Sequence, residues 1–220
     1  MPASYRLALL ASGAGTNLQA LIDAIASGEL DAEIVGVFSD KAKAFALQRA
    51  RDAGIATTVV SPKAFDARET FDASFFEAVD GAKADLIVCA GYMRIISAAE
   101  IARRPNRMIN LHPSLLPAFK GLHTHQQALD ADASEHGASV HVVTADLDDG
   151  PVIAQGRVPV RADDTADSLA ARVREIEHPL LVETVRLLAE GRLRLAVGGP
   201  ELNGAPLAAP LQLGANRRLA

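Results

Sequence analysis

Short apolar runs alternate with helical stretches along the first half of the chain, and this alternation constrains the fold more than any other feature of the sequence. Each run is bounded by Gly, Asp, Pro or Asn, as expected of buried strands. The predicted strands are residues 7–11, 34–38, 57–60, 86–90 and 108–111, and the predicted helices between them are residues 17–27, 42–53, 67–79 and 97–104. Strands that alternate with helices of this length form parallel β-α-β units. We therefore predict an α/β fold with a doubly wound, mostly parallel twisted sheet and flanking helices, whose ligands bind at the carboxyl ends of the strands.

The rhythm changes after residue 111. Two prolines, Pro113 and Pro117, exclude a helix interior there and predict an ordered loop. The elements predicted beyond it are a short helix at residues 123–132, strands at 139–144 and 152–160 around an acidic loop, and a long amphipathic helix that starts at a Thr165 cap, is kinked at Pro179 and ends before Gly191. Periodicity is then lost, so we expect residues 198–220 to be a loosely attached tail.

Charge and composition exclude several classes of protein. A net charge of −5 argues against a nucleic-acid binder, which needs a basic surface to neutralise phosphates. The single cysteine, Cys89, can form no intrachain disulfide and falls in a predicted buried strand, which suits a core residue in a reducing compartment. No stretch approaches the roughly 18 apolar residues of a membrane helix, and the first apolar run is too short for a signal peptide. We expect a cytoplasmic protein with no nucleic-acid or membrane partner.

A glycine-rich loop follows the first predicted strand, where residues 12–17 are Ser-Gly-Ala-Gly-Thr-Asn. Glycines let backbone N–H groups approach an anion, and the next helix adds its positive N-terminal end. The third glycine of a dinucleotide fingerprint is replaced by Leu18, so a single phosphate monoester fits better than NAD. A tight turn that holds no ligand is the alternative. Asp40, after the second strand, is expected to be a solvated strand end rather than a ribose-binding acid.

Asn110 and His112 lie two residues apart at the end of a predicted strand, so both side chains can point the same way. An amide donor beside an imidazole suits a developing oxyanion, and an imidazole can carry a proton in the working pH range. Asp148, in the acidic loop, offers a carboxylate that can hold the imidazole protonated. A satisfied polar pair on the strand and a solvated turn around Asp148 are the alternatives.

We expect no metal. A calcium loop beginning at Asp146 is disfavoured because Arg157 stands at its twelfth position, where a glutamate is needed. His123 and His125 belong to no His-Glu-x-x-His or paired-cysteine pattern.

Several segments, taken in order, resemble those of the glycinamide ribonucleotide formyltransferase family. The matching residues are 12–20, 65–69, 90–96, 109–117, 121–125, 136–141, 147–148, 150–153 and 177–178, within roughly residues 5–195. The pattern Asn-x-His-Pro-Ser-x-Leu-Pro with a later Asp is shared by the wider formyltransferase group. The glycine-rich loop and the Gly-Leu-His-Thr-His stretch narrow the resemblance to this family.

The resemblance implies a formyltransferase fold with a Rossmann-like N-terminal half. Residues 1–197 would form one domain, divided into a phosphate-binding half, 1–111, and a catalytic and folate-binding half, 112–197. The formyl group would come from 10-formyltetrahydrofolate, as co-substrate, and go to the amine of N1-(5-phospho-D-ribosyl)glycinamide in de novo purine biosynthesis. The implied residues are Asn110, His112 and Asp148 for catalysis, Gly15, Thr16, Asn17 and Glu177 for the phosphate and ribose, and Arg68, Met93, Arg94, Ile95, Ile96 and Asn110 for the folate.

The implied reaction is a direct attack of the amine on the formyl carbon, with no covalent enzyme intermediate. Asn110 and protonated His112 would stabilise the oxyanion, while Asp148 raises the pKa of His112 and helps a proton to reach the departing folate nitrogen. Two departures from the family pattern concern the site. Asp149 stands where relatives often have Gly or Ala, and Pro179 directly follows His178, which leaves the bend of that helix open.

Three other functions compete with this one. A formyltetrahydrofolate hydrolase shares the catalytic trio (Asn110, His112 and Asp148) but sends the formyl group to water, and such enzymes usually carry an extra N-terminal regulatory domain. A methionyl-tRNA formyltransferase needs a further C-terminal domain and a basic face. A catalytically silent nucleotide-binding module is disfavoured by the intact trio. We expect small-molecule substrates and a monomer or homodimer.

Overall fold

The structure is a computed structural model that describes residues 4–220. The chain divides into two compact units, Met1–Ile109 and Asn110–Ala220. The sequence places the division after residue 111, and the structure places it two residues earlier, inside strand β5 (Met108–His112).

The first unit is built on four parallel strands in the spatial order β4-β1-β2-β3. The strands are β1 (Tyr5–Leu10), β2 (Ala32–Ser39), β3 (Thr57–Val59) and β4 (Leu86–Cys89). They fall on the predicted apolar runs to within two residues. All four residues of β4 and the last four of β1 are buried, which explains why both read as continuous apolar runs without alternation.

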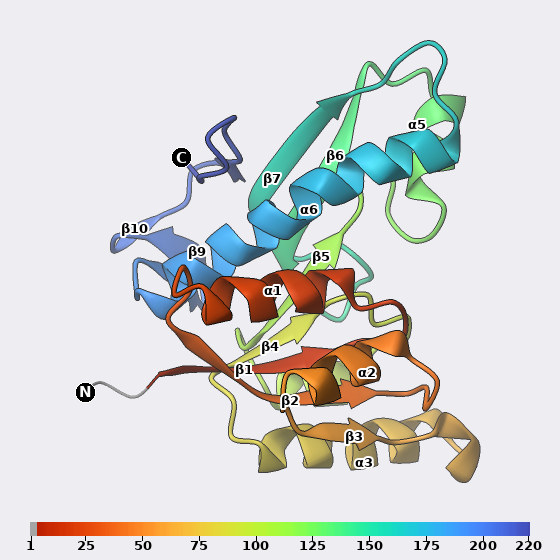
Figure 1. Ribbon diagram of the computed structural model, residues 1–220, viewed down its shortest axis with the longest axis vertical. Helices are drawn as coiled ribbons and strands as arrows, with labels where there is room; N and C mark the ends of the chain where they lie inside the picture. Colours follow the sequence, from red (N-terminus) through yellow and green to blue (C-terminus); the bar gives the residue numbers. More distant parts are fainter. Residues whose placement is uncertain (1–3) are drawn as a thin grey trace. The chain divides into compact units, whose positions relative to one another are not determined.

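Helices cover both faces of these strands. They are α1 (Thr16–Ala26), α2 (Phe45–Asp52), α3 (Arg68–Gly81) and α4 (Ala98–Ala102), with a 3-10 turn, η1, at Pro62–Ala64. Right-handed crossovers from β1 to β2 and from β2 to β3 place α1 and α2 on one face. The crossover from β3 back to β4 runs in the opposite direction, so α3 lies on the other face (Figure 1). The doubly wound arrangement predicted from the sequence is confirmed in this unit.

The buried face of α3 is aromatic. Phe71, Phe75 and Phe76 are among the largest fully buried side chains, and their rings contact one another at centroid distances of 5.5–5.6 Å. Tilted and edge-to-face ring contacts of this kind are favourable. Tyr92, in the loop after β4, packs on Phe75 at 5.3 Å and so ties that loop to α3.

The second unit contains two antiparallel strands, β6 (Glu135–Val142) and β7 (Val152–Pro159), and two helices, α5 (Thr124–Asp130) and α6 (Ala166–Ala189). In Figure 1, α6 lies across β6 and β7. The predicted cap is confirmed: Thr165 Oγ1 accepts a hydrogen bond from the N–H of Ser168, whose hydroxyl accepts one from the Thr165 N–H. The helix continues through Pro179 as far as Ala189.

Residues after 197 differ from the expected loose tail. Strands β8 (Leu193–Ala196), β9 (Gly199–Leu202) and β10 (Ala205–Pro206) form a small antiparallel sheet. A further strand, β11 (Leu211–Gln212), pairs in parallel with β7 and buries Leu211. Strands this short carry too few residues for a periodic pattern, so their pairing is visible only in the folded chain.

The C-terminal residues are also anchored by charge. Glu183 of α6 is 1% exposed and accepts hydrogen bonds from the guanidinium groups of Arg186 and Arg218 and from the N–H of Leu219. Burial raises the pKa of Glu183, but these hydrogen bonds outweigh burial and hold the pKa below its ordinary value. The carboxylate is therefore ionised at neutral pH and binds the end of the chain to α6.

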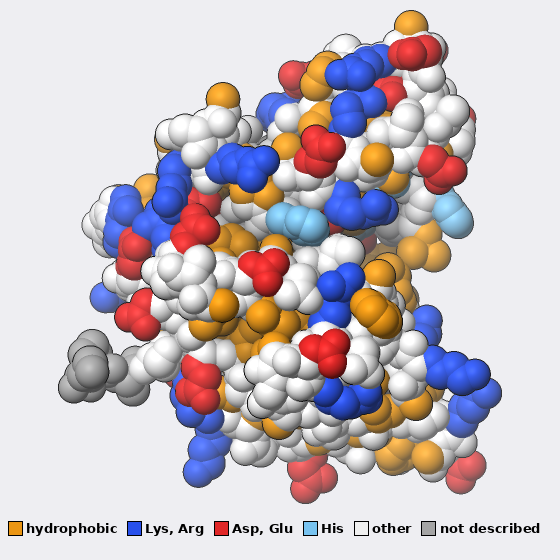
Figure 2. Space-filling view, viewed as in Figure 1, with side chains coloured by type: hydrophobic (Ala, Val, Ile, Leu, Met, Phe, Trp, Pro, Cys, Tyr) orange, Lys and Arg blue, Asp and Glu red, His pale blue; other side chains and the backbone are white. Residues whose placement is uncertain are grey.

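Two surface properties bear on partners. None of the helices within residues 4–220 is long and apolar enough to cross a membrane. On the face shown in Figure 2, acidic and basic side chains are interspersed rather than separated by sign.

We predict that Arg218→Ala destabilises the protein by about 1–2 kcal/mol, because buried Glu183 loses a charge-assisted hydrogen bond. The matched control is Arg217→Ala, which removes an exposed guanidinium from the neighbouring position and should change stability by less than about 0.5 kcal/mol. Urea unfolding followed by circular dichroism measures both. Equal effects of the two changes would mean that the tail is not anchored through Glu183.

Candidate active site

The glycine-rich loop adopts a backbone that only glycine accommodates at one position. Gly15 has φ +70° and precedes α1, and a Cβ built there would lie 2.6 Å from the Cβ of Ala46. The loop is held against α2 by a hydrogen bond of 3.0 Å from the N–H of Ala46 to the carbonyl of Gly13. Thr16 and Asn17 then open α1, at the end of the helix where backbone N–H groups favour an anion.

Three loops at the carboxyl ends of the strands are joined through Ser12. Its hydroxyl donates to Oδ1 of Asp40 at 2.6 Å and accepts from the N–H of Met93 at 3.0 Å, while its own N–H donates to the carbonyl of Gly91 at 3.0 Å. Asp40 is only 5% exposed, so the expectation of a solvated strand end was wrong. The carboxylate is buried because it joins the loops that follow β1, β2 and β4.

The segment after β4 presents the side chains expected to contact folate. Met93 and Ile95 are exposed, at 66% and 55%, and Ile96 is buried. The guanidinium of Arg94 lies over the ring of Phe71, 4.7 Å from its centroid. Arg68, at the start of α3, lies 3.6 Å from the buried carboxylate of Asp72. Arg94 and Arg68 therefore both lie at the N-terminal half of α3.

The structure brings the predicted trio together within the second unit. Nδ1 of His112 lies 3.4 Å from Oδ2 of Asp148, and Nδ2 of Asn110 lies 3.5 Å from Oδ1 of the same carboxylate. Asn110 and His112 reach Asp148 from one side of β5, as the two-residue spacing predicts. Asp148 itself has φ +50°, a conformation that few residues other than glycine adopt.

His141 is a fourth member of this cluster. It lies on β6, donates from Nδ1 to the carbonyl of Val142 at 3.0 Å, and so presents an unprotonated Nε2 to Nδ2 of Asn110 at 3.1 Å. The same Nε2 lies 3.6 Å from Oδ1 of Asp148. An acceptor on each side fixes the Asn110 amide with its N–H groups toward His141 and Asp148. The sequence gave His141 no role, although it closes the His-Gly-Ala-Ser-Val-His segment of the family resemblance.

Opposing effects set the pKa of His112. Burial lowers it and has the largest effect, a hydrogen bond between Nε2 and the carbonyl of Phe119 at 3.0 Å raises it, Asp148 raises it further, and His141 lowers it. The net pKa is below the ordinary value, so the imidazole is neutral at pH 7. Asp148 acts in the direction expected from the sequence, but burial outweighs it.

Asp148 remains ionised. Burial raises its pKa, but hydrogen bonds with His141 and with the N–H of Gly121, at 3.0 Å, together with the two nearby imidazoles, bring the net pKa below the ordinary value. Beside this contact, Lys120 and Asp149 form an ion pair. Two adjacent contacts thus join residues 120–121 to residues 148–149, and Asp149, which departs from the family pattern, is one half of the second.

Two further expectations concern single residues. Glu177, expected at the ribose, lies on α6 in the second unit, whereas Gly15, Thr16 and Asn17 belong to the first. Cys89 is buried in β4, and burial raises its pKa to about 12, so the prediction of an unreactive core cysteine is confirmed. Within residues 4–220, no three His, Cys, Asp or Glu side chains are grouped so as to hold a metal ion.

A pair of histidines packs behind the site. His136 is fully buried, its Nε2 lies 3.1 Å from Nδ1 of His125, and the two rings meet edge to face at 5.1 Å. Only one proton fits between these two nitrogens. Burial first, then the nearby His125 and His112, lower the pKa of His136 to about 4. The folded protein therefore keeps His136 neutral well below neutral pH.

Comparison with known proteins gives consistent results. A profile of the formyl transferase family matches residues 5–185. Phosphoribosylglycinamide formyltransferase of Escherichia coli (strain K12) is 46% identical over 198 residues, which cover 90% of this chain and 93% of that protein. The solved structure of phosphoribosylglycinamide formyltransferase from Coxiella burnetii in complex with CHES superposes with a TM-score of 0.89 at 43% identity, covering 94% of this chain and 97% of the other. A formyltetrahydrofolate deformylase from Pseudomonas syringae pv. tomato is more distant, at 28% identity and a TM-score of 0.83, covering 91% of this chain and 66% of its own.

We predict that the protein loses stability as the pH falls from about 6.5 to about 4. In this window the unfolded chain protonates His136 and the folded chain does not, so protonation favours unfolding, by on the order of 3 kcal/mol from this residue at the lower limit. Urea unfolding at several pH values measures the slope, which His136→Gln should flatten. An identical slope in the wild type and the variant would contradict the assignment to His136.

Proposed function

The chain belongs to the formyl transferase family, and we propose that it transfers the formyl group of 10-formyltetrahydrofolate to the amine of N1-(5-phospho-D-ribosyl)glycinamide, a step of de novo purine biosynthesis. One observation carries the chemistry: Asn110, His112 and Asp148, from β5 and a distant loop, lie within 3.5 Å contacts of one another. The acceptor is supported by relatives of that name at 46% and 43% identity, which match this chain over nearly their whole length.

The amine attacks the formyl carbon directly, and the carbonyl oxygen takes up the negative charge. Asn110 Nδ2 and His112 Nε2 carry the hydrogens that stabilise this oxyanion. In the structure Nε2 faces the carbonyl of Phe119, so the formyl oxygen would replace that carbonyl as the acceptor. Breakdown of the intermediate cleaves the bond from carbon to the folate nitrogen, and the proton lost by the amine is delivered to that nitrogen.

Asp148 makes the protonated form of His112 accessible during this step. The imidazole is neutral in the substrate-free protein because burial outweighs the carboxylate. A developing oxyanion adds negative charge beside the ring and raises the pKa of His112, with Asp148 already 3.4 Å from Nδ1. The ionised carboxylate therefore permits His112 to gain a proton when the oxyanion forms and to release it afterwards.

Substrate binding is assigned to the loops already described. Gly15, Thr16 and Asn17 would hold the phosphate with backbone N–H groups and the positive end of α1, and Glu177 would bind the ribose hydroxyls. Met93, Ile95, Ile96 and the Asn110 amide would line the folate pocket. Arg68 and Arg94 would bind its carboxylates.

The remaining assignments are narrower. The substrates are small molecules, and no step of this chemistry requires a metal. A monomer or a homodimer in the cytoplasm remains our prediction.

We predict that formyl transfer requires the acceptor. Incubation with 10-formyltetrahydrofolate should release tetrahydrofolate only when phosphoribosylglycinamide is present, with one formylated product for each tetrahydrofolate released. Release at the same rate without the acceptor would instead identify a formyltetrahydrofolate hydrolase.

We predict that Asp148 and His112 act as one unit. His112→Ala should slow single-turnover transfer by roughly 10²–10³, the usual effect of losing one oxyanion donor. Asp148→Asn should lower the pKa of His112 further and move the pH optimum downward, because the carboxylate raises that pKa in the wild type. The double variant should be little slower than the slower single variant.

The matched control is Asp149→Asn, which removes the neighbouring charge that pairs with Lys120 and contacts neither imidazole. It should retain most of the activity. Substrate affinities, measured by calorimetry, should change little in all variants. Rate effects that multiply in the double variant would contradict the proposed coupling.

A further inference from the structure

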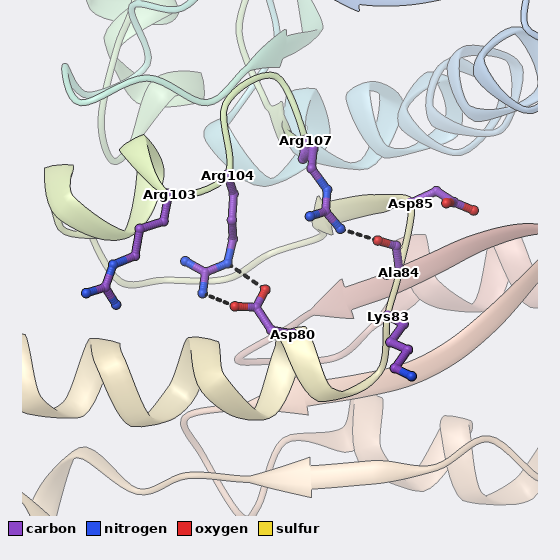
Figure 3. A pocket seen from close by; sticks show the side chains of 7 residues that line it. All are labelled: Asp80, Lys83, Ala84, Asp85, Arg103, Arg104 and Arg107. Atoms are coloured by element: carbon purple, nitrogen blue, oxygen red, sulfur yellow. Dashed lines mark hydrogen bonds and ion pairs between the residues drawn. The ribbon is translucent and has the colours of Figure 1, made fainter.

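Two cavities lie at opposite edges of the parallel strands of the first unit. The larger, of about 450 Å³, lies at their amino ends and is lined by Asp80, Asp85, Lys83, Arg103, Arg104 and Arg107, with Ala84. Figure 3 shows that Arg104 points at Asp80 and that Arg107 points at the carbonyl of Ala84. Arg104 also pairs with Glu100, and the N–H of Arg6 donates to Asp85. These groups satisfy one another, so this cavity holds the fold together and offers little to a ligand.

The second cavity lies at the carboxyl ends of the strands and differs in its charges. We call it the Lys41–Lys63 cavity. It measures about 350 Å³ and is lined by Asp40, Lys41 and Ala42 after β2, Ser61, Pro62 and Lys63 after β3, and Arg94 after β4. This volume is at the lower end of the range of roughly 300–1,000 Å³ for ligand pockets. Three cations face one carboxylate, which leaves a formal charge of +2 on the lining.

The charges of this cavity are available to a ligand. The one carboxylate, Asp40, is buried and accepts the hydroxyl of Ser12. Lys41 and Lys63 are exposed and have no carboxylate within 4 Å in residues 4–220. The Nε of Arg94 is buried and, among the described residues, has no hydrogen-bond partner. A buried guanidinium donor without a partner is costly, so its position marks where an acceptor from a ligand would lie.

Arg94 connects this cavity to the proposed folate pocket, because it belongs to both. The benzoyl end of a folate carries a glutamate, and longer folates add glutamates joined through their γ-carboxyl groups, each with a free carboxylate. A chain that leaves the folate pocket past Arg94 would therefore bring one negative charge per residue to Lys41 and Lys63.

We propose that the Lys41–Lys63 cavity is a subsite for the γ-linked glutamate chain of the folate co-substrate, so that polyglutamylated 10-formyltetrahydrofolate is preferred to the monoglutamate. This rests on the proposed function for the identity of the co-substrate. The recognised chemistry is a row of carboxylates on a flexible chain, bound by cations from three loops. Free phosphate could meet the same cations, and the experiment separates the two.

The test compares 10-formyltetrahydrofolate with one and with three glutamates, using phosphoribosylglycinamide as acceptor. For the wild type, the KM of the triglutamate should be about five- to tenfold lower, with kcat nearly equal, since each exposed ion pair contributes a factor of up to about five. The advantage should shrink at high salt. Lys41→Ala/Lys63→Ala should remove most of it while leaving the KM of the monoglutamate unchanged. Lys63→Glu should reverse part of it.

The matched control is Lys43→Ala. Lys43 is exposed and lies two residues from Lys41, but it does not line the cavity. The control should keep the full preference for the triglutamate. Equal loss in the control and in the double variant would mean that net charge, and not this cavity, determines the preference.

Calorimetry with folic acid and its triglutamate gives a readout that does not depend on transfer. Tighter binding of the triglutamate, lost in the double variant, supports the subsite even if the acceptor proves to be different. Equal KM and equal affinity for the two chain lengths would overturn it. Inhibition by inorganic phosphate that disappears in the double variant, without any dependence on chain length, would also overturn it in favour of a free-anion site. A protein that transfers no formyl group from either folate would refute the proposed function separately.

Discussion

The carboxylate of Asp148 is the group on which the arrangement of the candidate active site depends. It lies within reach of His112, His141, the Asn110 amide and the N–H of Gly121. A charge this far from water is stable only when several donors surround it. The residue also holds an uncommon backbone conformation, with φ +50°, which strains a side chain other than glycine. Both costs are met by the same contacts, so the geometry of the trio and the stability of the loop cannot be separated.

The tuning of His112 follows from that arrangement. A buried imidazole alone would be neutral over most of the pH range, and an imidazole beside an exposed carboxylate would be protonated at neutral pH. In this site both influences are present, and burial exceeds the pull of the carboxylate. The ring is neutral at rest yet has an acceptor at each nitrogen, the Phe119 carbonyl and Asp148. A small change in local charge is then enough to change its protonation state, which is what a proton carrier requires.

The first unit organises its carboxyl edge by a different means. Ser12 and Asp40 join three loops by short hydrogen bonds, and the packing of Tyr92 and Arg94 on the aromatic face of α3 positions the segment after β4. Most charges at the amino edge pair with one another. At the carboxyl edge Lys41, Lys63 and the buried Nε of Arg94 remain without protein partners in the part of the chain that is described. This asymmetry agrees with the general rule that open parallel sheets bind ligands at the carboxyl ends of their strands.

The sequence by itself determined the features that depend on near neighbours along the chain. Buried runs predicted the parallel strands, Thr165 predicted the start of α6, and the two-residue spacing placed Asn110 and His112 on one side of β5, because period and capping are local properties. Tertiary structure alone decided the rest. Asp148 reaches Asn110 across 38 positions, His141 joins them from another strand, and β11 finds its place beside β7. The burial of Asp40 and the lowered pKa of His112 belong to the same class. Burial and long-range pairing depend on which distant segments exclude water from a group, and no local pattern records that.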